Sequence, residues 1–285
     1  MTKKIAVIND LSGFGRCSLT AAISVLSVMG VQPCPLPTAV LSGQTGYPSY
    51  YCDDYTDRMD YFRQEWEKMG VSFDGIYTGF VASEEQIEHI FRFLDTFYKK
   101  NTFLLVDPVM GDDGTVYKMF TPRLLHKMKE LVMRADIVTP NLTELCLLTD
   151  TDYRMLGSLV DERHLLTMIE QMAKNLIQKG PKTVVVTGIR FTDQGDGESK
   201  IGNLVVTKKQ SKLSAFPYIG GSFSGTGDLF ASVITGGMAR GDDIFEMIDL
   251  AGVFIERSMK DSVEEQVERN DGANYEKYLG MLLRM

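Results

Sequence analysis

Short apolar runs alternate with longer amphipathic stretches along most of the chain. The apolar runs are continuous and rich in β-branched residues, as is typical of strands that helices cover on both faces of a parallel sheet. We predict strands over residues 5–8, 75–81, 103–107, 136–139 and 183–187. The helical periodicity predicts helices near residues 18–29, 55–69, 84–99, 122–134, 161–179, 226–239 and 243–260. The chain is therefore expected to form repeated β-α units around a mainly parallel sheet.

Two of the predicted helices have clear starts. Ser83 stands before two glutamates, and Thr121 stands before a proline. Serine and threonine are favoured helix N-caps, and proline suits the first helical turn. We therefore expect the helices to begin directly after Ser83 and Thr121.

Two stretches interrupt the alternation. Residues 33–56 are rich in proline, glycine and tyrosine, and we expect them to form a peripheral element over the functional site. Residues 188–220 contain a second apolar run at 203–206, which favours an antiparallel hairpin at the sheet edge. No linker or repeat divides the chain, so we predict a single α/β domain over residues 1–285.

Composition excludes several classes of protein. The chain has 285 residues with 44% hydrophobic and 24% charged residues, which is typical of soluble globular proteins. A net charge of −8 argues against a nucleic-acid partner. The apolar runs are too short for a signal peptide or a membrane span, so we expect a cytoplasmic protein with no membrane partner. Four separate cysteines and three separate histidines do not form a zinc pattern.

Polar residues follow the predicted strands, where ligands of open parallel sheets bind. Asn9 and Asp10 follow the first strand, and Gly188 follows the last of the predicted strands. Between them, Asp107, Asp112, Asn141 and Glu144 follow two further strands. We expect this sheet edge to carry the chemistry.

The segment Gly225-Thr226-Gly227-Asp228 stands directly before an apolar helix pattern. Amides at a helix N-terminus bind anions, and glycine lets phosphate oxygens approach the backbone. An aspartate in that place suits a base that accepts a hydroxyl proton during phosphoryl transfer. The alternative is a helix-capping aspartate after a tight glycine turn.

Three acidic residues are candidates for a magnesium site. Phosphoryl transfer from ATP needs Mg²⁺ held by oxygen ligands, and Asp107, Asp112 and Glu144 supply carboxylates. Each could instead cap a neighbouring helix or turn. Neither the G-x-x-x-x-G-K-[ST] motif nor the protein-kinase motifs occur.

Five segments together carry a resemblance to a known family. In chain order they are SGQTGY (42–47), DPVMGDDGTVY (107–117), TPNLTE (139–144), TVVVTG (183–188) and GTGDLFAS (225–232). With these segments the chain resembles the pyridoxal kinases of the ribokinase-like superfamily over nearly its whole length. The resemblance implies a three-layer α/β/α sandwich with a central, mostly parallel sheet, a small peripheral flap and an antiparallel edge hairpin. It also implies an ATP-dependent kinase acting on the 5′-hydroxymethyl group of pyridoxal, pyridoxine or pyridoxamine, and a homodimer.

The resemblance further implies roles for individual residues. Asp228 is the catalytic base, and Gly225, Thr226 and Gly227 stabilise the transferring phosphoryl group. The nucleotide side comprises Asn141, Glu144, Thr187 and Gly188 for ATP, Asp112 and Glu144 for Mg²⁺, and Asp107 and Thr139 for a monovalent cation such as K⁺. Thr45 faces the pyridine substrate.

Two positions depart from the family pattern. Asp10 stands where a serine is expected after the first strand, and Phe80 stands where a tyrosine is frequent. A carboxylate at position 10 can bind a ring hydroxyl, a pyridinium or an aminopyrimidine, or can cap the following turn. Phe80 can stack on a substrate ring or belong to the core.

Two other functions stay open from the sequence. A hydroxymethylpyrimidine kinase of thiamine synthesis shares the fold and the GTGD-type loop, although SGQTGY favours vitamin B6. A non-catalytic protein that binds a B6 vitamer would share the fold as well, but it gains nothing from a base at Asp228.

Overall fold

The computed structural model describes residues 1–157, 162–193, 195 and 197–283. Within it the chain folds into two compact units. Unit 1 consists of Met1–Leu105 and Ile219–Met285, and unit 2 consists of Val106–Tyr218. The expectation of a single domain over residues 1–285 stays a prediction.

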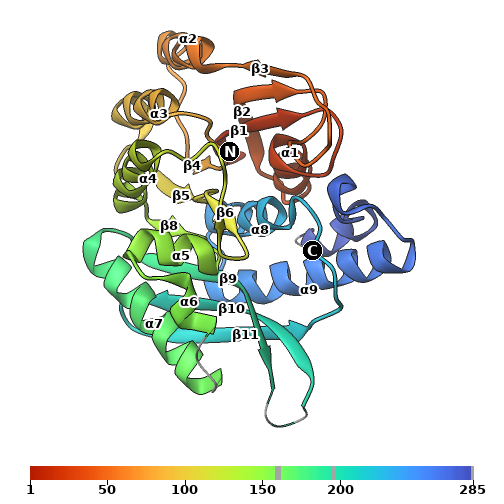
Figure 1. Cartoon of the computed structure of the whole chain (residues 1–285). Helices are drawn as coiled ribbons and strands as arrows, with labels where there is room; N and C mark the ends of the chain where they lie inside the picture. The colour runs from red at the N-terminus through yellow and green to blue at the C-terminus, as the bar shows by residue number, and fades with distance from the viewer. Residues whose placement is uncertain (158–161, 194, 196, 284–285) are drawn as a thin grey trace. The chain divides into compact units, whose positions relative to one another are not determined.

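The predicted fold class is confirmed. The described residues form a mostly parallel sheet flanked by helices (Figure 1) and a small antiparallel sheet. The small sheet pairs β6 (Gly111–Asp112) with β7 (Thr115–Val116). Continuous apolar runs therefore predicted buried strands correctly, because helices cover these strands.

In unit 1 the strands follow the order β5-β4-β1-β2-β3. Their bounds are β1 (Lys4–Ser12), β2 (Gln32–Leu41), β3 (Cys52–Asp54), β4 (Gly75–Thr78) and β5 (Phe103–Val106). β1 pairs in parallel with both β2 and β4, and Ile5 to Ile8 in β1 are fully buried. This places the carboxyl end of β1 inside the sheet, next to the loops that carry polar residues.

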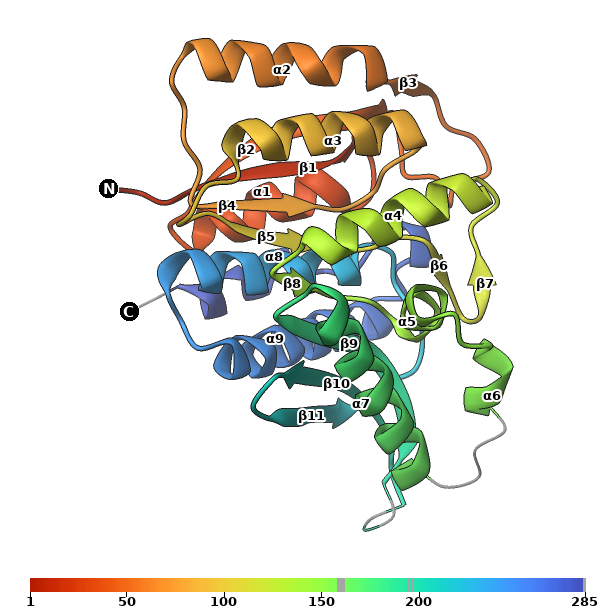
Figure 2. The ribbon, with the colours of Figure 1, turned by 90° about the vertical axis from the view of Figure 1, so that its left-hand side faces the viewer.

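The helices of unit 1 cover both faces of its strands. They are α1 (Ser18–Val28), α2 (Thr56–Lys68), α3 (Glu84–Phe97), α8 (Thr226–Arg240) and α9 (Ile244–Glu264), followed by the 3₁₀ turns η1 (Arg269–Asp271) and η2 (Glu276–Leu282). Figure 2 shows α2 and α3 on one face of the strands, and α1 and α8 on the other. Helix α8 packs on both α1 and α9, which buries its apolar side chains from Leu229 to Ile234.

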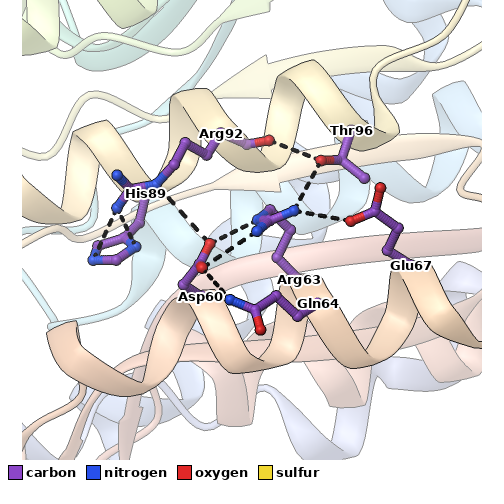
Figure 3. A network of polar contacts seen from close by, with 7 residues as sticks. All are labelled: Asp60, Arg63, Gln64, Glu67, His89, Arg92 and Thr96. Atoms are coloured by element: carbon purple, nitrogen blue, oxygen red, sulfur yellow. Dashed lines mark hydrogen bonds and ion pairs between the residues drawn. The ribbon is translucent and has the colours of Figure 1, made fainter.

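A polar network joins α2 to α3 on the surface of unit 1 (Figure 3). Arg63 Nε donates to Asp60 Oδ1 at 2.6 Å, and Gln64 Nε2 donates to Asp60 Oδ2 at 2.6 Å. Arg63 also reaches Thr96 of α3 at 3.4 Å. The Arg63 hydrogen bonds lower the pKa of Asp60 to about 2, so the aspartate is charged at neutral pH and ties the two helices together.

The structure corrects the prediction that residues 33–56 form only a peripheral element. Residues 32–41 are strand β2, which pairs with β1 along its length. The sequence did not predict this strand because it contains Pro33, Pro35 and Pro37, and proline is unusual within strands. The N–H of Gln32 donates to the carbonyl oxygen of Lys3, and alternate residues of a strand point their N–H groups to opposite edges. The backbone nitrogens of the three prolines, which have no hydrogen to donate, therefore point away from β1. They lie at the other edge of β2, where β3 pairs only with residues from Ala39 onward and no described strand needs their N–H groups.

In unit 2 the strands follow the order β11-β10-β9-β8. Their bounds are β8 (Ile137–Val138), β9 (Thr183–Thr192), β10 (Ser199–Thr207) and β11 (Ser211–Pro217). β10 pairs antiparallel with both β9 and β11, which confirms the predicted edge hairpin. β9 runs five residues beyond the predicted end at 187, because β10 supplies an antiparallel partner for that extension.

The helices of unit 2 are α4 (Pro122–Arg134), α5 (Leu142–Thr149), α6 (Tyr153–Gly157) and α7 (Glu162–Lys179). α4 and α7 match predicted helices, although residue 161 lies outside the described residues. The sequence pattern did not predict α5 and α6, which are only eight and five residues long. In the part of the chain that the structure describes, no helix combines the length and the apolar character that a membrane crossing requires.

Candidate active site

The glycine-rich segment 225–228 forms the start of α8 in unit 1, as predicted. Gly225 is the N-cap and has a left-handed backbone with φ 83°. A Cβ at Gly225 would overlap the carbonyl oxygen of Arg16, which precedes α1. Only glycine fits both the backbone conformation and the space, so the loop packs directly on the segment before α1.

Asp228 lies in the first turn of α8 and is held by Asn9 of β1, whose Nδ2 donates to Asp228 Oδ1 at 2.9 Å. The backbone N–H of Ser18 in α1 and the side chain of Tyr77 in β4 lie near enough to lower its pKa. Three elements far apart in the sequence therefore surround Asp228.

Burial raises the pKa of Asp228 to about 6, and the neighbouring charge of Asp10 contributes to the rise. The nearby Ser18 N–H, the hydrogen bond from Asn9 and the nearby Tyr77 side chain act in the opposite direction, because they stabilise the charged form. A carboxylate with a pKa near neutrality is ionised at pH 7 and still basic enough to accept a proton. Asp228 therefore has the properties of a general base.

Asn9 orients the carboxylate of Asp228. Its side-chain oxygen Oδ1 accepts the backbone N–H groups of Asp10 at 3.0 Å and Phe80 at 2.8 Å. These two donors leave the amide nitrogen Nδ2 directed at Asp228. The sequence places Asn9 after the first strand, but its partnership with Asp228 spans 219 residues and could not be predicted.

Asp10 lies in β1, only 6% exposed. Its carboxylate accepts Ser18 Oγ at 2.5 Å and Ser12 Oγ at 2.8 Å. Burial raises the pKa of Asp10, while both serine hydroxyls lower it. Ser18 has φ 51°, a backbone conformation that residues other than glycine rarely adopt. Its hydroxyl donates to Asp10 from this backbone conformation.

The loop with residues 42–47 lies beside the start of α8. Gln44 is 9% exposed, and its Nε2 donates to Ser224 Oγ at 3.3 Å. The neighbouring Thr45 is exposed. Phe80 is half-buried just beyond the end of β4, where its carbonyl oxygen accepts Thr38 Oγ1 at 3.0 Å. Unit 1 therefore places Asp10 near Asp228 and brings the loop that carries Thr45 to the start of α8 through Gln44.

In unit 2, Glu144 is 5% exposed and forms a capping box with Asn141 at the start of α5. Its Oε2 accepts the N–H of Asn141 at 2.8 Å, and its Oε1 accepts the N–H of Met110 at 3.0 Å. Burial raises the pKa of Glu144 well above the usual value, and the charges of Asp107 and Asp112 add to the rise. The alternative interpretation from the sequence, that Glu144 caps a neighbouring helix, therefore describes one role of this residue.

The other predicted nucleotide-side residues lie near this box in unit 2. Thr139 Oγ1 donates to Asp107 Oδ1 at 2.9 Å, and both residues are buried. Asp112 is exposed in β6, and the carbonyl oxygen of the neighbouring Gly111 accepts Asn141 Nδ2 at 2.8 Å.

Thr187 and Gly188 lie on β9. Thr187 forms a parallel bridge with Asn141, which connects β9 to the capping box. Gly188 has φ 69°, and its N–H donates to Asn203 Oδ1 at 3.3 Å. Strand β9 thus places both residues next to the start of α5.

Hard oxygen donors are the ligands that Mg²⁺ prefers, and unit 2 supplies them at Asp107, Asp112 and Glu144. The charges of Asp107 and Asp112 raise the pKa of Glu144, so a cation near the three carboxylates would relieve their repulsion. Among the described residues, no group of three or more His, Cys, Asp or Glu side chains is arranged to hold a metal ion. A Mg²⁺ ion at these carboxylates would need its remaining ligands from water and phosphate.

The fold is that of solved kinase structures with the ribokinase-like architecture. The chain belongs to the phosphomethylpyrimidine kinase family, whose sequence model matches residues 17–273. The predicted resemblance to this group of kinases is thereby confirmed.

The chain is similar to proteins of both kinds, pyridoxal kinases and pyrimidine kinases. A protein from Bacteroides thetaiotaomicron assigned as a phosphomethylpyrimidine kinase and crystallised with pyridoxal is 37% identical, with a TM-score of 0.90, and the match covers 99% of this chain and 96% of that chain. A pyridoxal kinase of Rubrobacter xylanophilus is 28% identical over 86% of this chain and 83% of its own. A hydroxymethylpyrimidine/phosphomethylpyrimidine kinase of Bacillus subtilis is 25% identical over 91% of this chain and 83% of its own.

Proposed function

We propose that this chain is an ATP-dependent kinase that phosphorylates the 5′-hydroxymethyl group of pyridoxal, pyridoxine or pyridoxamine. The observation that carries the proposal is Asp228, a base with a pKa near 6 at the start of a glycine-rich helix. The similarity to a protein crystallised with pyridoxal supports the choice of substrate.

In the proposed reaction the hydroxyl oxygen of the vitamer attacks the γ-phosphorus of ATP. The bond from the γ-phosphorus to the bridging oxygen breaks, ADP leaves, and the hydroxyl proton passes to Asp228. The backbone amides of Gly225, Thr226 and Gly227 stabilise the charge on the transferring group, because they lie at the N-terminus of α8.

We assign ATP binding to Asn141, Glu144, Thr187 and Gly188 of unit 2. Asp112 and Glu144 would hold Mg²⁺, whose charge offsets that of the phosphates when it is bound. Asp107 and Thr139, joined by their buried hydrogen bond, would hold a monovalent cation such as K⁺. Each assignment is consistent with the oxygen-rich surroundings of these residues.

We assign the vitamer to Thr45, Asp10 and Phe80 of unit 1. Thr45 is exposed beside the start of α8, and Phe80 is half-buried at the end of β4. Asp10 is buried and accepts one serine hydroxyl on each carboxylate oxygen, which leaves acceptor sites for a donor of the vitamer. We also expect a cytoplasmic homodimer, and sedimentation would measure the oligomeric state.

The test of the base is Asp228→Asn, which keeps the size of the side chain and removes its basicity. We expect kcat to fall by at least about 100-fold, while the Kd for ATP stays within about twofold. Asp57→Asn is the matched control, since Asp57 is an exposed aspartate in the first turn of α2. Near-normal turnover of Asp228→Asn would end the assignment.

A second candidate is a hydroxymethylpyrimidine kinase, which the family description and the Bacillus subtilis relative favour. It keeps the fold and the role of Asp228, but changes the ring that carries the hydroxymethyl group. ADP release with each B6 vitamer and with hydroxymethylpyrimidine, at equal concentration, separates the two. Vitamer binding without ADP release would instead indicate a binding protein.

A further inference from the structure

The turn formed by residues 269–272, which we name the C-terminal clasp, is bonded to two loops of the site through its backbone. The N–H of Ser224 donates to the carbonyl oxygen of Arg269 at 3.0 Å. The N–H of Arg16 donates to the carbonyl oxygen of Asp271 at 3.0 Å. The clasp therefore joins the residue before Gly225 to the segment before α1.

The same clasp grips the loop 42–47 on both sides of Thr45. Asn270 Nδ2 donates to the carbonyl oxygen of Gly46 at 2.8 Å, and Gln44 Nε2 donates to the carbonyl oxygen of Asn270 at 3.1 Å. One residue further on, Tyr47 Oη donates to Asp271 Oδ1 at 2.5 Å. Thr45 stays exposed between two neighbours that are fixed to one asparagine.

Close packing shows that these contacts leave little room for movement. A Cβ at Gly46 would lie 2.5 Å from Asn270 Oδ1. Gly272 has φ 81°, and a Cβ there would lie 2.7 Å from Arg16 Cβ and 3.0 Å from the carbonyl oxygen of Ser224. Gly272 requires glycine, because its backbone conformation and the backbone of Ser224 leave no room for a side chain. At Gly46 a side chain would displace the ends of the Asn270 and Gln44 side chains that hold the loop.

We propose that Asn270 and Asp271 are positioning residues that hold Thr45 in place beside the start of α8 for binding of the vitamer. The inference rests on the proposed function, since it assigns Thr45 to the vitamer. It also gives a role to the segment 269–272, which carries none of the predicted site residues.

The main variant is Asn270→Asp, which keeps the side-chain size but replaces the amide donor with a carboxylate facing the Gly46 carbonyl oxygen. We expect the KM for the vitamer to rise at least about tenfold, while the KM for ATP stays within about twofold. Tyr47→Phe removes the second link and should raise the vitamer KM by a smaller factor. Glu268→Gln is the matched control, an exposed residue of the same segment, and should leave both KM values unchanged.

Amide hydrogen exchange over residues 42–47 is the second readout, because it needs no activity. Asn270→Asp should speed exchange in this loop. Glu268→Gln should leave the exchange of the loop as in the wild type. An unchanged vitamer KM in an active enzyme, an equal rise of both KM values, or unchanged exchange would overturn the inference. If the wild type phosphorylates neither a vitamer nor hydroxymethylpyrimidine, the proposed function fails. Faster exchange in the variant would then still support the clasp.

Discussion

The half-buried carboxylate of Asp228 is expected to weaken the fold at neutral pH. The pKa of Asp228 is about 6 in the folded protein, and an aspartate in an unfolded chain has a pKa near ~3.9. A raised pKa in the folded state stabilises the protein below the unfolded pKa, and this stability is lost as the pH rises through about 6. Asp228→Asn does not titrate, so its stability relative to the wild type should improve as the pH rises.

The size of this effect follows from the two pKa values. A difference of about two pKa units corresponds to about 3 kcal/mol when the whole titration is crossed. Between pH 4.5 and pH 8 the crossing is incomplete, which leaves about 2 kcal/mol. The variant does not titrate at position 228, so the change in relative stability with pH reports the titration of Asp228 in the wild type, including the effect of its hydrogen bond from Asn9 on the charged form.

Urea unfolding of the wild type and of Asp228→Asn at pH 4.5 and pH 8 measures this difference. The free energy of unfolding of the variant, relative to the wild type, should be about 2 kcal/mol more favourable at pH 8 than at pH 4.5. A relative stability that does not change with pH, or that falls as the pH rises, would refute the reasoning. It would show that Asp228 is not desolvated.

Two further predictions concern stability. Asp60→Asn removes a carboxylate that is 25% exposed and hydrogen-bonded to Arg63, so it should lower the free energy of unfolding by about 1 kcal/mol at pH 7 in urea unfolding. Because the pKa of Asp60 is lowered to about 2, the deficit should shrink as the pH falls toward that value, and equal stability at pH 7 would contradict it. Gly225→Ala should cost at least about 2 kcal/mol more than Gly188→Ala by the same assay. Both glycines have positive φ, but only at Gly225 does a Cβ meet the Arg16 carbonyl oxygen, so equal costs would speak against the packing described here.

Local patterns predicted most of the fold. Ser83 Oγ accepts the N–H of Gln86, and Thr121 Oγ1 accepts that of Leu124, so both predicted caps are confirmed. Strand β2 escaped prediction because its prolines resemble a loop, and their tolerance depends on a strand edge that only the folded sheet defines. Helix α5 escaped because it is short and packs through tertiary contacts rather than through a long periodic pattern.

The site was predicted in part for a similar reason. Residues near a glycine-rich helix start or after a strand, such as Asp228 and Glu144, stand out by local pattern. The partners that tune them do not, because Asn9 hydrogen-bonds to Asp228 across 219 residues of sequence. Charge, burial and long-range hydrogen bonds appear only when the strands are assembled.

The identity of the substrate tests the central claim, that this chain phosphorylates a B6 vitamer. Pyridoxal and hydroxymethylpyrimidine at equal concentration, incubated together with the protein, ATP, Mg²⁺ and K⁺, would compete for phosphorylation by the same enzyme. Mass spectrometry would identify the phosphorylated product. We predict that pyridoxal 5′-phosphate forms first and in excess. Predominant formation of hydroxymethylpyrimidine phosphate would contradict the assignment to vitamin B6, and formation of neither would contradict a kinase for these substrates.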